Sequence, residues 1–453
     1  MKRELFGTDG IRGVAGQYPL NPQTVFAVGA ALGRWISERR AEAEVVIGMD
    51  TRESGPWIAE YVAGGLESNG VRARSAGLIT TPGIAYVART GPFAAGVMIS
   101  ASHNPYQDNG IKVLDHSGFK LPDEQEHALE REIFALLERG VEAKPLSLAP
   151  DESLDRQYVD YLASTFDGRL DGMRMIVDAA NGSASYIGPE LFQRLGASVE
   201  AIASSPDGRN INLNCGSLHL DHLRQAVLRA GADIGVALDG DADRALFVSH
   251  AGQVVDGDAV MLITGVALHA EGRLAGSDGR PVVVATVMSN LGLERALAAH
   301  GIEMARTPVG DKYVLEEMER RGAKLGGEQS GHIIFRDWAT TGDGLLTALR
   351  VLEIVQKSGK MLDELAASLV VYPQMLVNVR VKQKLPLDQL PRVQEAIREA
   401  ERAFGDSGRV VVRFSGTEPL ARVMIEGPEL GDVERMARRI ADAIRQELGG
   451  GER

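Results

Sequence analysis

The chain has 453 residues, of which 44% are hydrophobic and 25% charged, and this composition excludes a disordered chain, a collagen-like repeat and a coiled coil. The formal net charge of −13 at pH 7 argues against a nucleic-acid coat, which needs a basic face, but local cations can still attract a small anionic substrate. Cys215 is the single cysteine, so no internal disulfide can form, and we expect a reducing compartment. No apolar run is long enough for a signal peptide or a membrane span. We therefore expect a cytoplasmic protein that binds neither nucleic acid nor membrane.

The predicted elements alternate strand, turn and helix, which indicates α/β units with largely parallel sheets. In the first unit we expect Ser54 to cap the helix that follows the strand, and Asn69-Gly70 to end that helix. The strands, turns and helices of the three units are, in chain order, 45–49, 50–55 and 57–66; 175–178, 181–185 and 189–197; and 282–287, 288–292 and 293–301.

The last part of the chain has another pattern, with an alternating strand, a helix, a strand pair and a final amphipathic helix. This order predicts a small α+β domain. The fold class is therefore α/β, with three similar mixed α/β domains plus a smaller C-terminal α+β domain. The expected domains are 1–157, 158–256, 257–372 and 373–453.

The first candidate loop carries Ser102, which follows the apolar strand 96–99. A serine acts as a nucleophile only beside a base or an electrophile, and His103 and Lys112 are close in sequence. The alternative is that the hydroxyl bonds its own backbone in a turn. The loop is not the elbow of a serine hydrolase, because it lacks G-x-S-x-G.

The second candidate loop is DGDADR, 239–244, which follows an apolar strand. Asp239, Asp241 and Asp243 would repel one another unless a cation lay between them, and oxygen ligands favour Mg²⁺ or Ca²⁺. A solvated Asp-Gly hairpin turn is the alternative. An EF-hand is excluded, because its sixth and twelfth positions would be Arg244 and His250 rather than Gly and Glu.

The third candidate loop is GGEQSGHI, 326–333. Glu328, Ser330 and His332 are hydrogen-bonding groups between glycines, and such groups suit sugar hydroxyls. A polar surface turn is the alternative.

The fourth candidate loop is RFSGTEPLAR, 413–422. A tight turn at 415–417 can point its amides outward as a nest for an anion, and the flanking Arg413 and Arg422 suit phosphate. A plain hairpin turn with surface arginines is the alternative. The chain has no GxxxxGK[ST] motif, so a nucleotide P-loop does not bind the phosphate.

Taken in order, five segments of this sequence resemble the α-D-phosphohexomutase family from end to end of the chain. Within the family, Gln329 makes the third loop similar to that of the members that act on glucosamine phosphate. Phe414 is a departure, because many relatives have proline there. The five segments are FGTDGIRG (6–13), SASHNP (100–105), DGDADR (239–244), GEQSGH (327–332) and RFSGTEP (413–419).

The resemblance implies four domains around a central cleft, a phosphoserine at Ser102 and one Mg²⁺ per chain, held by three acids and a phosphoryl oxygen. It also implies roles for further residues in proton transfer, charge stabilisation and substrate binding. The catalytic candidates are Ser102, Arg12, Lys112 and His332; the substrate-binding candidates are Glu328, Ser330, Arg413, Ser415, Gly416, Thr417 and Arg422; the metal ligands are Ser102, Asp239, Asp241 and Asp243.

The activity that the resemblance implies is the interconversion of glucosamine 6-phosphate and glucosamine 1-phosphate through a 1,6-bisphosphate, a step towards UDP-N-acetylglucosamine. The expected partner is thus a small hexosamine phosphate. The alternatives are phosphomannomutase or phosphoglucomutase activity, a metal-dependent sugar-phosphate phosphatase, and a non-catalytic sugar-phosphate binding protein. The sequence leaves open whether the chain forms a homo-oligomer.

Overall fold

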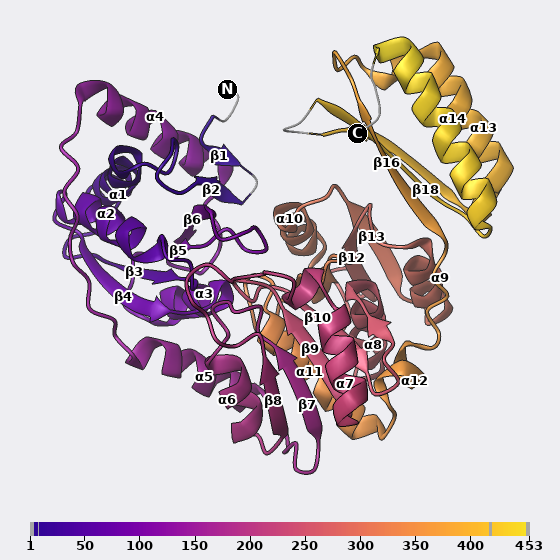
Figure 1. Cartoon of the computed structure of the whole chain (residues 1–453), viewed down its shortest axis with the longest axis horizontal. Helices are drawn as coiled ribbons and strands as arrows, with labels where there is room; N and C mark the ends of the chain where they lie inside the picture. Colours follow the sequence, from indigo (N-terminus) through magenta and orange to yellow (C-terminus); the bar gives the residue numbers. More distant parts are fainter. Residues whose placement is uncertain (1–3, 8, 416–418, 450–453) are drawn as a thin grey trace.

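The computed structural model describes residues 4–7, 9–415 and 419–449. Four sheets, each with its own helices, follow one another along an arc, and the last unit stands opposite the first across the open side of the arc (Figure 1). Three mixed α/β units and a smaller α+β unit were expected, and this prediction is confirmed. Within the described ranges, no helix combines the length and the apolar character that crossing a membrane requires.

The first unit is built on a six-stranded sheet with the order β1-β2-β6-β5-β3-β4. Its centre is parallel, because β3 pairs in parallel with both β4 and β5, whereas β6 runs antiparallel to β5 and β2. Helices α1 and α2 pack on each other. The elements are β1 (Phe6–Gly7), β2 (Gly10–Val14), α1 (Pro22–Ser37), β3 (Glu44–Met49), α2 (Gly55–Glu67), β4 (Arg72–Leu78), α3 (Thr81–Thr90), β5 (Ala95–Ile99), β6 (Asp108–Asp115) and α4 (Asp123–Arg139).

The second unit repeats this plan in a five-stranded sheet with the order β11-β10-β9-β7-β8. Strand β7 pairs in parallel with β8 and β9, and β10 returns antiparallel to β9. The elements are α5 (Ser153–Thr165), β7 (Arg174–Asp178), α6 (Ile187–Arg194), β8 (Ser198–Ile202), the 3-10 helix η1 (Gly216–Leu218), α7 (Asp221–Ala230), β9 (Ile234–Leu238), β10 (Ala245–Ser249) and β11 (Val254–Val255).

The third unit has a four-stranded sheet with the order β13-β12-β14-β15. Strand β12 pairs in parallel with β13 and β14, and β15 returns antiparallel to β14. The elements are α8 (Gly257–Ala270), β12 (Val282–Thr286), α9 (Leu291–Ala299), β13 (Glu303–Thr307), α10 (Asp311–Arg321), β14 (Leu325–Gly327), β15 (Ile333–Phe335), α11 (Gly344–Ser358) and α12 (Leu362–Ala366).

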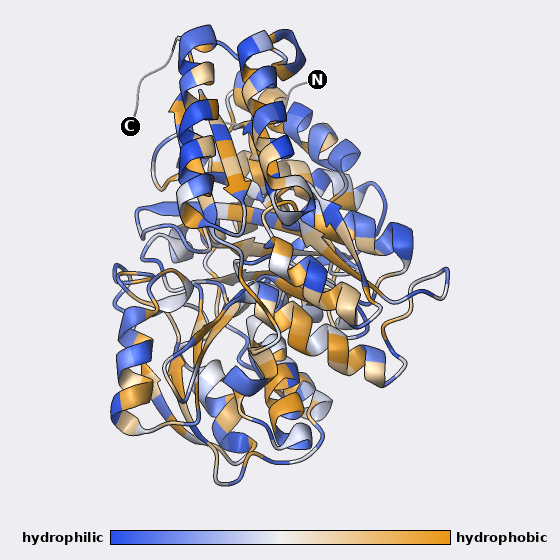
Figure 2. Cartoon of the chain, turned by 90° about the vertical axis from the view of Figure 1, so that its right-hand side faces the viewer, coloured by the Kyte–Doolittle hydropathy of each residue, from blue (hydrophilic) through white to orange (hydrophobic). Residues whose placement is uncertain are grey.

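The last unit has an antiparallel three-stranded sheet with the order β16-β18-β17. Two amphipathic helices, α13 and α14, cover it, and their hydrophilic residues stand in front of hydrophobic strands in Figure 2. The elements are β16 (Gln374–Arg380), η2 (Leu387–Gln389), α13 (Pro391–Phe404), η3 (Gly405–Ser407), β17 (Arg409–Phe414), β18 (Leu420–Glu426) and α14 (Leu430–Leu448).

The expectation of largely parallel sheets is wrong for the first two units, where antiparallel pairings equal or outnumber parallel ones, and it holds for the third. The antiparallel strands position the site. In each of the first three units the last strand of the parallel centre continues through a short loop into an antiparallel strand. A hairpin returns the chain directly, whereas a parallel connection needs a crossover of a dozen or more residues. The three candidate loops are these hairpin loops, 100–107, 239–244 and 328–332, and the fourth candidate loop is the β17–β18 hairpin.

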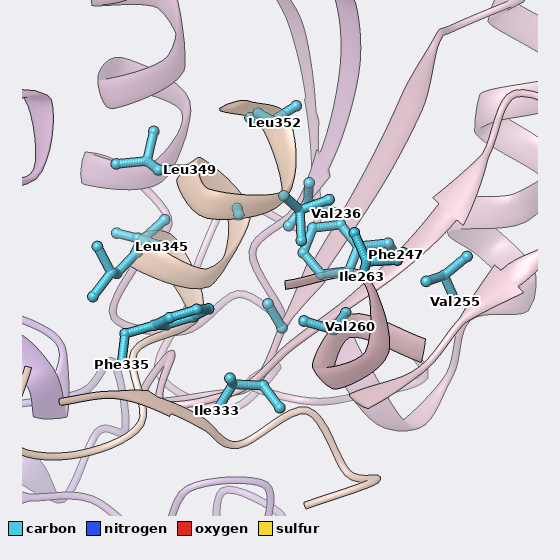
Figure 3. Packing of buried hydrophobic residues seen from close by; sticks show 14 of the residues in the cluster. Val236, Phe247, Val255, Val260, Ile263, Ile333, Phe335, Leu345, Leu349 and Leu352 are labelled. Carbon is cyan, nitrogen blue, oxygen red and sulfur yellow. The ribbon is translucent and has the colours of Figure 1, made fainter. Parts of the chain in front are cut away.

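The second and third units share one hydrophobic core. Figure 3 shows Val236 and Phe247 of the second unit close to Val260 and Ile263 of α8, with Phe335 of the third unit nearby. The first unit has two further clusters, and the last unit has one. Burial of apolar surface stabilises this shared core by about 25 cal/mol per Å². The second and third units therefore form one body.

The predicted cap of α2 is not present, because the side chain of Ser54 has another partner. Ser54 makes no hydrogen bond to the helix amides. Its Oγ accepts a 2.8 Å hydrogen bond from Nδ2 of Asn109, at the start of β6. The helix begins instead with Pro56 in its first turn, where a missing N–H costs nothing.

Candidate active site

Ser102 lies in the hairpin loop after β5, with a φ of +52°, a left-handed conformation that few serines adopt. The residue is 1% exposed. Its Oγ donates a 2.7 Å hydrogen bond to Oδ2 of Asp239 in the second unit and lies 3.4 Å from Nδ1 of His103. Its backbone N–H donates to Oγ of Ser100 at 2.9 Å. The backbone of the loop is thus fixed by Ser100, and the hydroxyl faces the acids of another unit.

The three carboxylates of the DGDADR loop form one cluster. One oxygen from each of Asp239, Asp241 and Asp243 lies within 4.8 Å of the others, and all three residues are buried. Oδ1 of Asp241 and Oδ1 of Asp243 accept no hydrogen bond from the described residues. Buried anionic oxygens that accept no hydrogen bond are costly unless a cation neutralises them, and Mg²⁺ takes such hard oxygen ligands. The donor set therefore fits a magnesium ion.

The charges of these acids depend on their neighbours. Burial, followed by the charges of Asp243 and Asp241, raises the pKa of Asp239 well above its usual value. Burial would also raise the pKa of Asp241, but Lys112 and a hydrogen bond from Thr81 outweigh it and lower that pKa. Like charges this close oppose full ionisation, and a divalent cation among them would remove that opposition.

Lys112, on β6, is a buried cation that joins the first two units. Its Nζ lies 2.8 Å from Oδ2 of Asp241 and 3.0 Å from Oδ2 of Asp9. Burial would lower the pKa of Lys112, but the charges of Asp241 and Asp9 outweigh it and raise that pKa, so the amine stays charged. Arg12 and Lys120 also pair with Asp9. The candidates Arg12 and Lys112 therefore meet on one carboxylate.

The hairpin loop after β14 holds the three candidates of the third unit. Oε1 of Glu328 accepts a hydrogen bond from the amide of Gly310 at 3.2 Å, and Oγ of Ser330 lies 3.5 Å from Oε2 of Glu328. His332 is 3% exposed, and its Nε2 accepts a hydrogen bond from the amide of Gly342 at 3.2 Å. Nδ1 of His332 makes no hydrogen bond to the described residues.

Two contacts connect this loop to the other units. The backbones of Arg244 and His332 form an antiparallel bridge between the second and third units. Lys120 of the first unit pairs with Asp311 at the start of α10, and Oδ2 of Asp311 lies 3.8 Å from Nε2 of His332. The structure therefore brings the three loops together where the first three units meet.

The candidates of the last unit lie at the end of its hairpin. Arg413 on β17 and Arg422 on β18 are directly opposite each other, and both are half-buried. Burial and the charge of Arg422 lower the pKa of Arg413. Like charges opposite each other on a sheet are destabilising, and an anion bound between them would relieve this. Ser415 is buried beside them, whereas the candidates Gly416 and Thr417 lie outside the described residues.

Several site residues were not predicted, because they come from distant parts of the chain. Oγ1 of Thr81 donates to Oδ2 of Asp241 at 2.5 Å. The fully buried Arg52 forms a 2.9 Å ion pair with Oδ2 of Asp50 and donates to carbonyls of the Ser102 loop. The sequence predicts only a turn at 50–55. The signal that could have revealed this ion pair is the position of Asp50 and Arg52 directly after a buried strand.

The chain matches one family along nearly its whole length. The matching descriptions are "Phosphoglucomutase/phosphomannomutase, alpha/beta/alpha domain I" at residues 3–139, domain II at 156–252, domain III at 256–372 and "C-terminal domain" at 376–443. All four domains of the family therefore occur, in order.

Known proteins are similar over the full length. A "Phosphoglucosamine mutase" of Solibacter usitatus is 63% identical over 99% of this chain and 100% of its own. A phosphoglucomutase/phosphomannomutase family structure from Burkholderia thailandensis superposes with a TM-score of 0.82 at 24% identity, covering 98% of both chains. An Aspergillus fumigatus N-acetylphosphoglucosamine mutase, solved in complex with GlcNAc-6P and magnesium, gives 0.68 at 19% identity, covering 98% of this chain and 96% of that one. The two structures share the fold, and the family matches carry the assignment: this chain belongs to the phosphoglucomutase/phosphomannomutase family, the α-D-phosphohexomutases.

Proposed function

We propose that the protein interconverts glucosamine 6-phosphate and glucosamine 1-phosphate by way of a phosphorylated Ser102 and a glucosamine 1,6-bisphosphate intermediate. The observation that carries the mechanism is the contact of Ser102 Oγ with Asp239 Oδ2 at 2.7 Å, inside a cluster of three acids. The full-length similarity to a phosphoglucosamine mutase supports the amino sugar as substrate.

In the first transfer, the bond between phosphorus and Ser102 Oγ breaks while a bond from phosphorus to the free sugar hydroxyl forms. The proton of that hydroxyl ends on Ser102 Oγ, and we assign its transfer to His103, whose Nδ1 lies 3.4 Å from Oγ. The reverse transfer, from the other end of the bisphosphate, restores the phosphoserine. Such transfers depend on in-line positioning and on neutralisation of charge.

Asp239, Asp241 and Asp243 would hold Mg²⁺, for which Oδ1 of Asp241 and Oδ1 of Asp243, which accept no hydrogen bond from the described residues, are suitable ligands. When bound, the ion supplies a Lewis acid beside the transferring group. The charged Lys112 and Arg12, both on Asp9, stabilise the negative charge of the phosphoryl group. The proposed role of Lys112 is thus electrostatic, since three carboxylates surround it.

We propose that the third unit binds the sugar and that the last unit binds its phosphate. Glu328 and Ser330 bind sugar hydroxyls in either of the two orientations that the mutase reaction requires. His332, whose ring is held by the amide of Gly342, is the candidate for proton transfer on the sugar side. Arg413 and Arg422 bind the phosphate that does not react, with guanidinium groups that suit its oxygens.

Parallel kinetics on glucosamine, glucose and mannose 6-phosphates test the proposed substrate. We expect kcat/KM for glucosamine 6-phosphate to exceed the other two values by about tenfold or more, a difference of roughly 1.4 kcal/mol in transition-state binding. A preference for glucose or mannose phosphate would support the corresponding rival mutase. Release of inorganic phosphate without isomerisation would support a phosphatase.

An Arg422→Ala variant is expected to raise KM for the sugar phosphate by about 10- to 100-fold, because a charge-assisted hydrogen bond is lost. We expect kcat to change little. Arg422→Lys should recover part of the loss, since lysine keeps the positive charge but lacks the planar guanidinium that can donate two hydrogen bonds to one phosphate. Steady-state kinetics measure both constants. Arg380→Ala is the matched control, since Arg380 is an exposed arginine on the same sheet. A fall in kcat alone would contradict the anchoring role.

A further inference from the structure

Two backbone carbonyls beside the reactive serine are bound from two units at once. Nη2 of Arg52, in the first unit, donates to the carbonyls of Ser102 and Asn104, both at 2.9 Å. Nδ2 of Asn212, in the second unit, donates to the same two carbonyls at 2.9 and 3.0 Å. We call these two donors and two carbonyls the carbonyl clamp. The clamp fixes the backbone on both sides of His103.

The metal loop packs directly on the clamp. A Cβ added to Gly240 would lie 2.5 Å from the carbonyl oxygen of Ser102 and 2.9 Å from Nδ2 of Asn212. The backbone of Gly240 in the second unit therefore lies directly against the serine loop, and a side chain at position 240 would push the two loops apart. Because its carbonyl is held in this way, Ser102 keeps its φ of +52° and directs its Oγ to Asp239.

Asparagine suits position 212 for two reasons. Its φ is +60°, and asparagine tolerates the left-handed region better than most residues. Its amide nitrogen supplies two protons, one for each carbonyl, and the two acceptors define which end of the amide faces them. The backbone N–H of Asn212 donates to the carbonyl of Ala180 at 2.8 Å, which anchors the residue in the second unit.

We propose that Asn212 is a positioning residue for phosphoryl transfer. It fixes Ser102, the phosphoryl carrier, relative to the acids that hold the metal, and it does so without touching the substrate. The inference rests on the proposed phosphoserine mechanism. A displacement of about 1 Å in such a site can cost roughly 100-fold in rate, so loss of the clamp lowers kcat. KM depends on the substrate contacts of the third and last units, so we expect it to stay unchanged.

The test uses Asn212→Asp and Asn212→Gly. Aspartate keeps the size and the tolerance of the left-handed region but presents oxygen to the two carbonyls, whereas glycine removes the side chain without backbone strain. Asn214→Asp and Asn214→Gly are matched controls, because Asn214 also has a positive φ, +53°, and its side chain is exposed. We expect kcat to fall about tenfold or more in Asn212→Asp and less in Asn212→Gly, with KM within about twofold; the Asn214 variants should match the wild type.

A second measurement separates positioning from stability and from the choice of substrate. Dephosphorylated protein is mixed with glucose 1,6-bisphosphate, and the rate at which Ser102 gains a phosphate is followed by intact mass. We expect this rate to fall in the Asn212 variants while their thermal midpoints stay near those of the Asn214 variants. Equal kcat and loading rates in both sets would overturn the inference, as would a loss of rate explained by unfolding. A wild type that loads Ser102 but does not isomerise glucosamine phosphates would refute the proposed substrate and leave this inference standing.

Discussion

A Ser102→Ala variant is expected to lose isomerase activity by roughly four orders of magnitude or more, because no other group can take over a nucleophile that carries the transferred group. The residue is buried, and its Oγ makes one hydrogen bond to Asp239. Loss of that bond costs about 1 kcal/mol, so the fold is retained. Turnover of glucosamine 6-phosphate and the thermal midpoint are the two measurements.

Ser102→Gly is the matched control for the backbone. Alanine at a φ of +52° bears the same strain of about 1–2 kcal/mol that serine already bears there, whereas glycine adopts this conformation freely. Both variants should be inactive, and neither should gain a phosphate from glucose 1,6-bisphosphate. An active glycine variant would end the phosphoserine mechanism, because it would show that only backbone geometry matters at this position.

Removal of divalent cations is expected to reduce activity by about 100-fold or more and to lower the thermal midpoint. The metal supplies several kcal/mol of charge stabilisation to the transferring group, and the buried cluster of three acids is left without neutralisation. An ion present at 100 times its dissociation constant stabilises the folded state by about 2.7 kcal/mol. Dialysis against EDTA followed by a Mg²⁺ titration, read by activity and by thermal melting, measures both effects.

Asp241→Asn extends this experiment. It should weaken the response to Mg²⁺, because one charged ligand becomes neutral, while Asp388→Asn, at an exposed position on the last unit, should behave as the wild type. Activity that survives chelation, or a midpoint that does not respond to Mg²⁺, would show that the cluster is not a metal site.

The order of the elements could be predicted because strand, turn and helix signals are local. The apolar run that forms β9 and the amphipathic spacing in α14 are visible in the sequence. The antiparallel direction of β10 and β15 was not foreseen, because both strands are buried along their whole length and so form the continuous apolar runs that are typical of parallel strands. The length of the connection could have shown the direction of β10, because the loop 239–244 is too short for a crossover helix.

The candidate site was predictable where its chemistry lies in one continuous segment, as with Asp239, Asp241 and Asp243. It was not predictable where the partner comes from far along the chain. Asn212 lies 108 and 110 positions from the residues it binds, and Thr81 lies 160 positions from Asp241. Only the packing of whole units brings such pairs together, and nothing in their local sequence records it.

The hairpin origin of the three loops has a consequence for how such a molecule can diverge. Each loop is closed at both ends by paired strands, so an insertion of one residue would change either the pairing or the loop, whereas a replacement within the loop changes neither. Selection for a new sugar can therefore act through single-residue substitutions in these loops, on a scaffold of constant length. Differences in substrate preference among descendants of one ancestor should accordingly be found as substitutions in these connections, with the strands that frame them left unaltered.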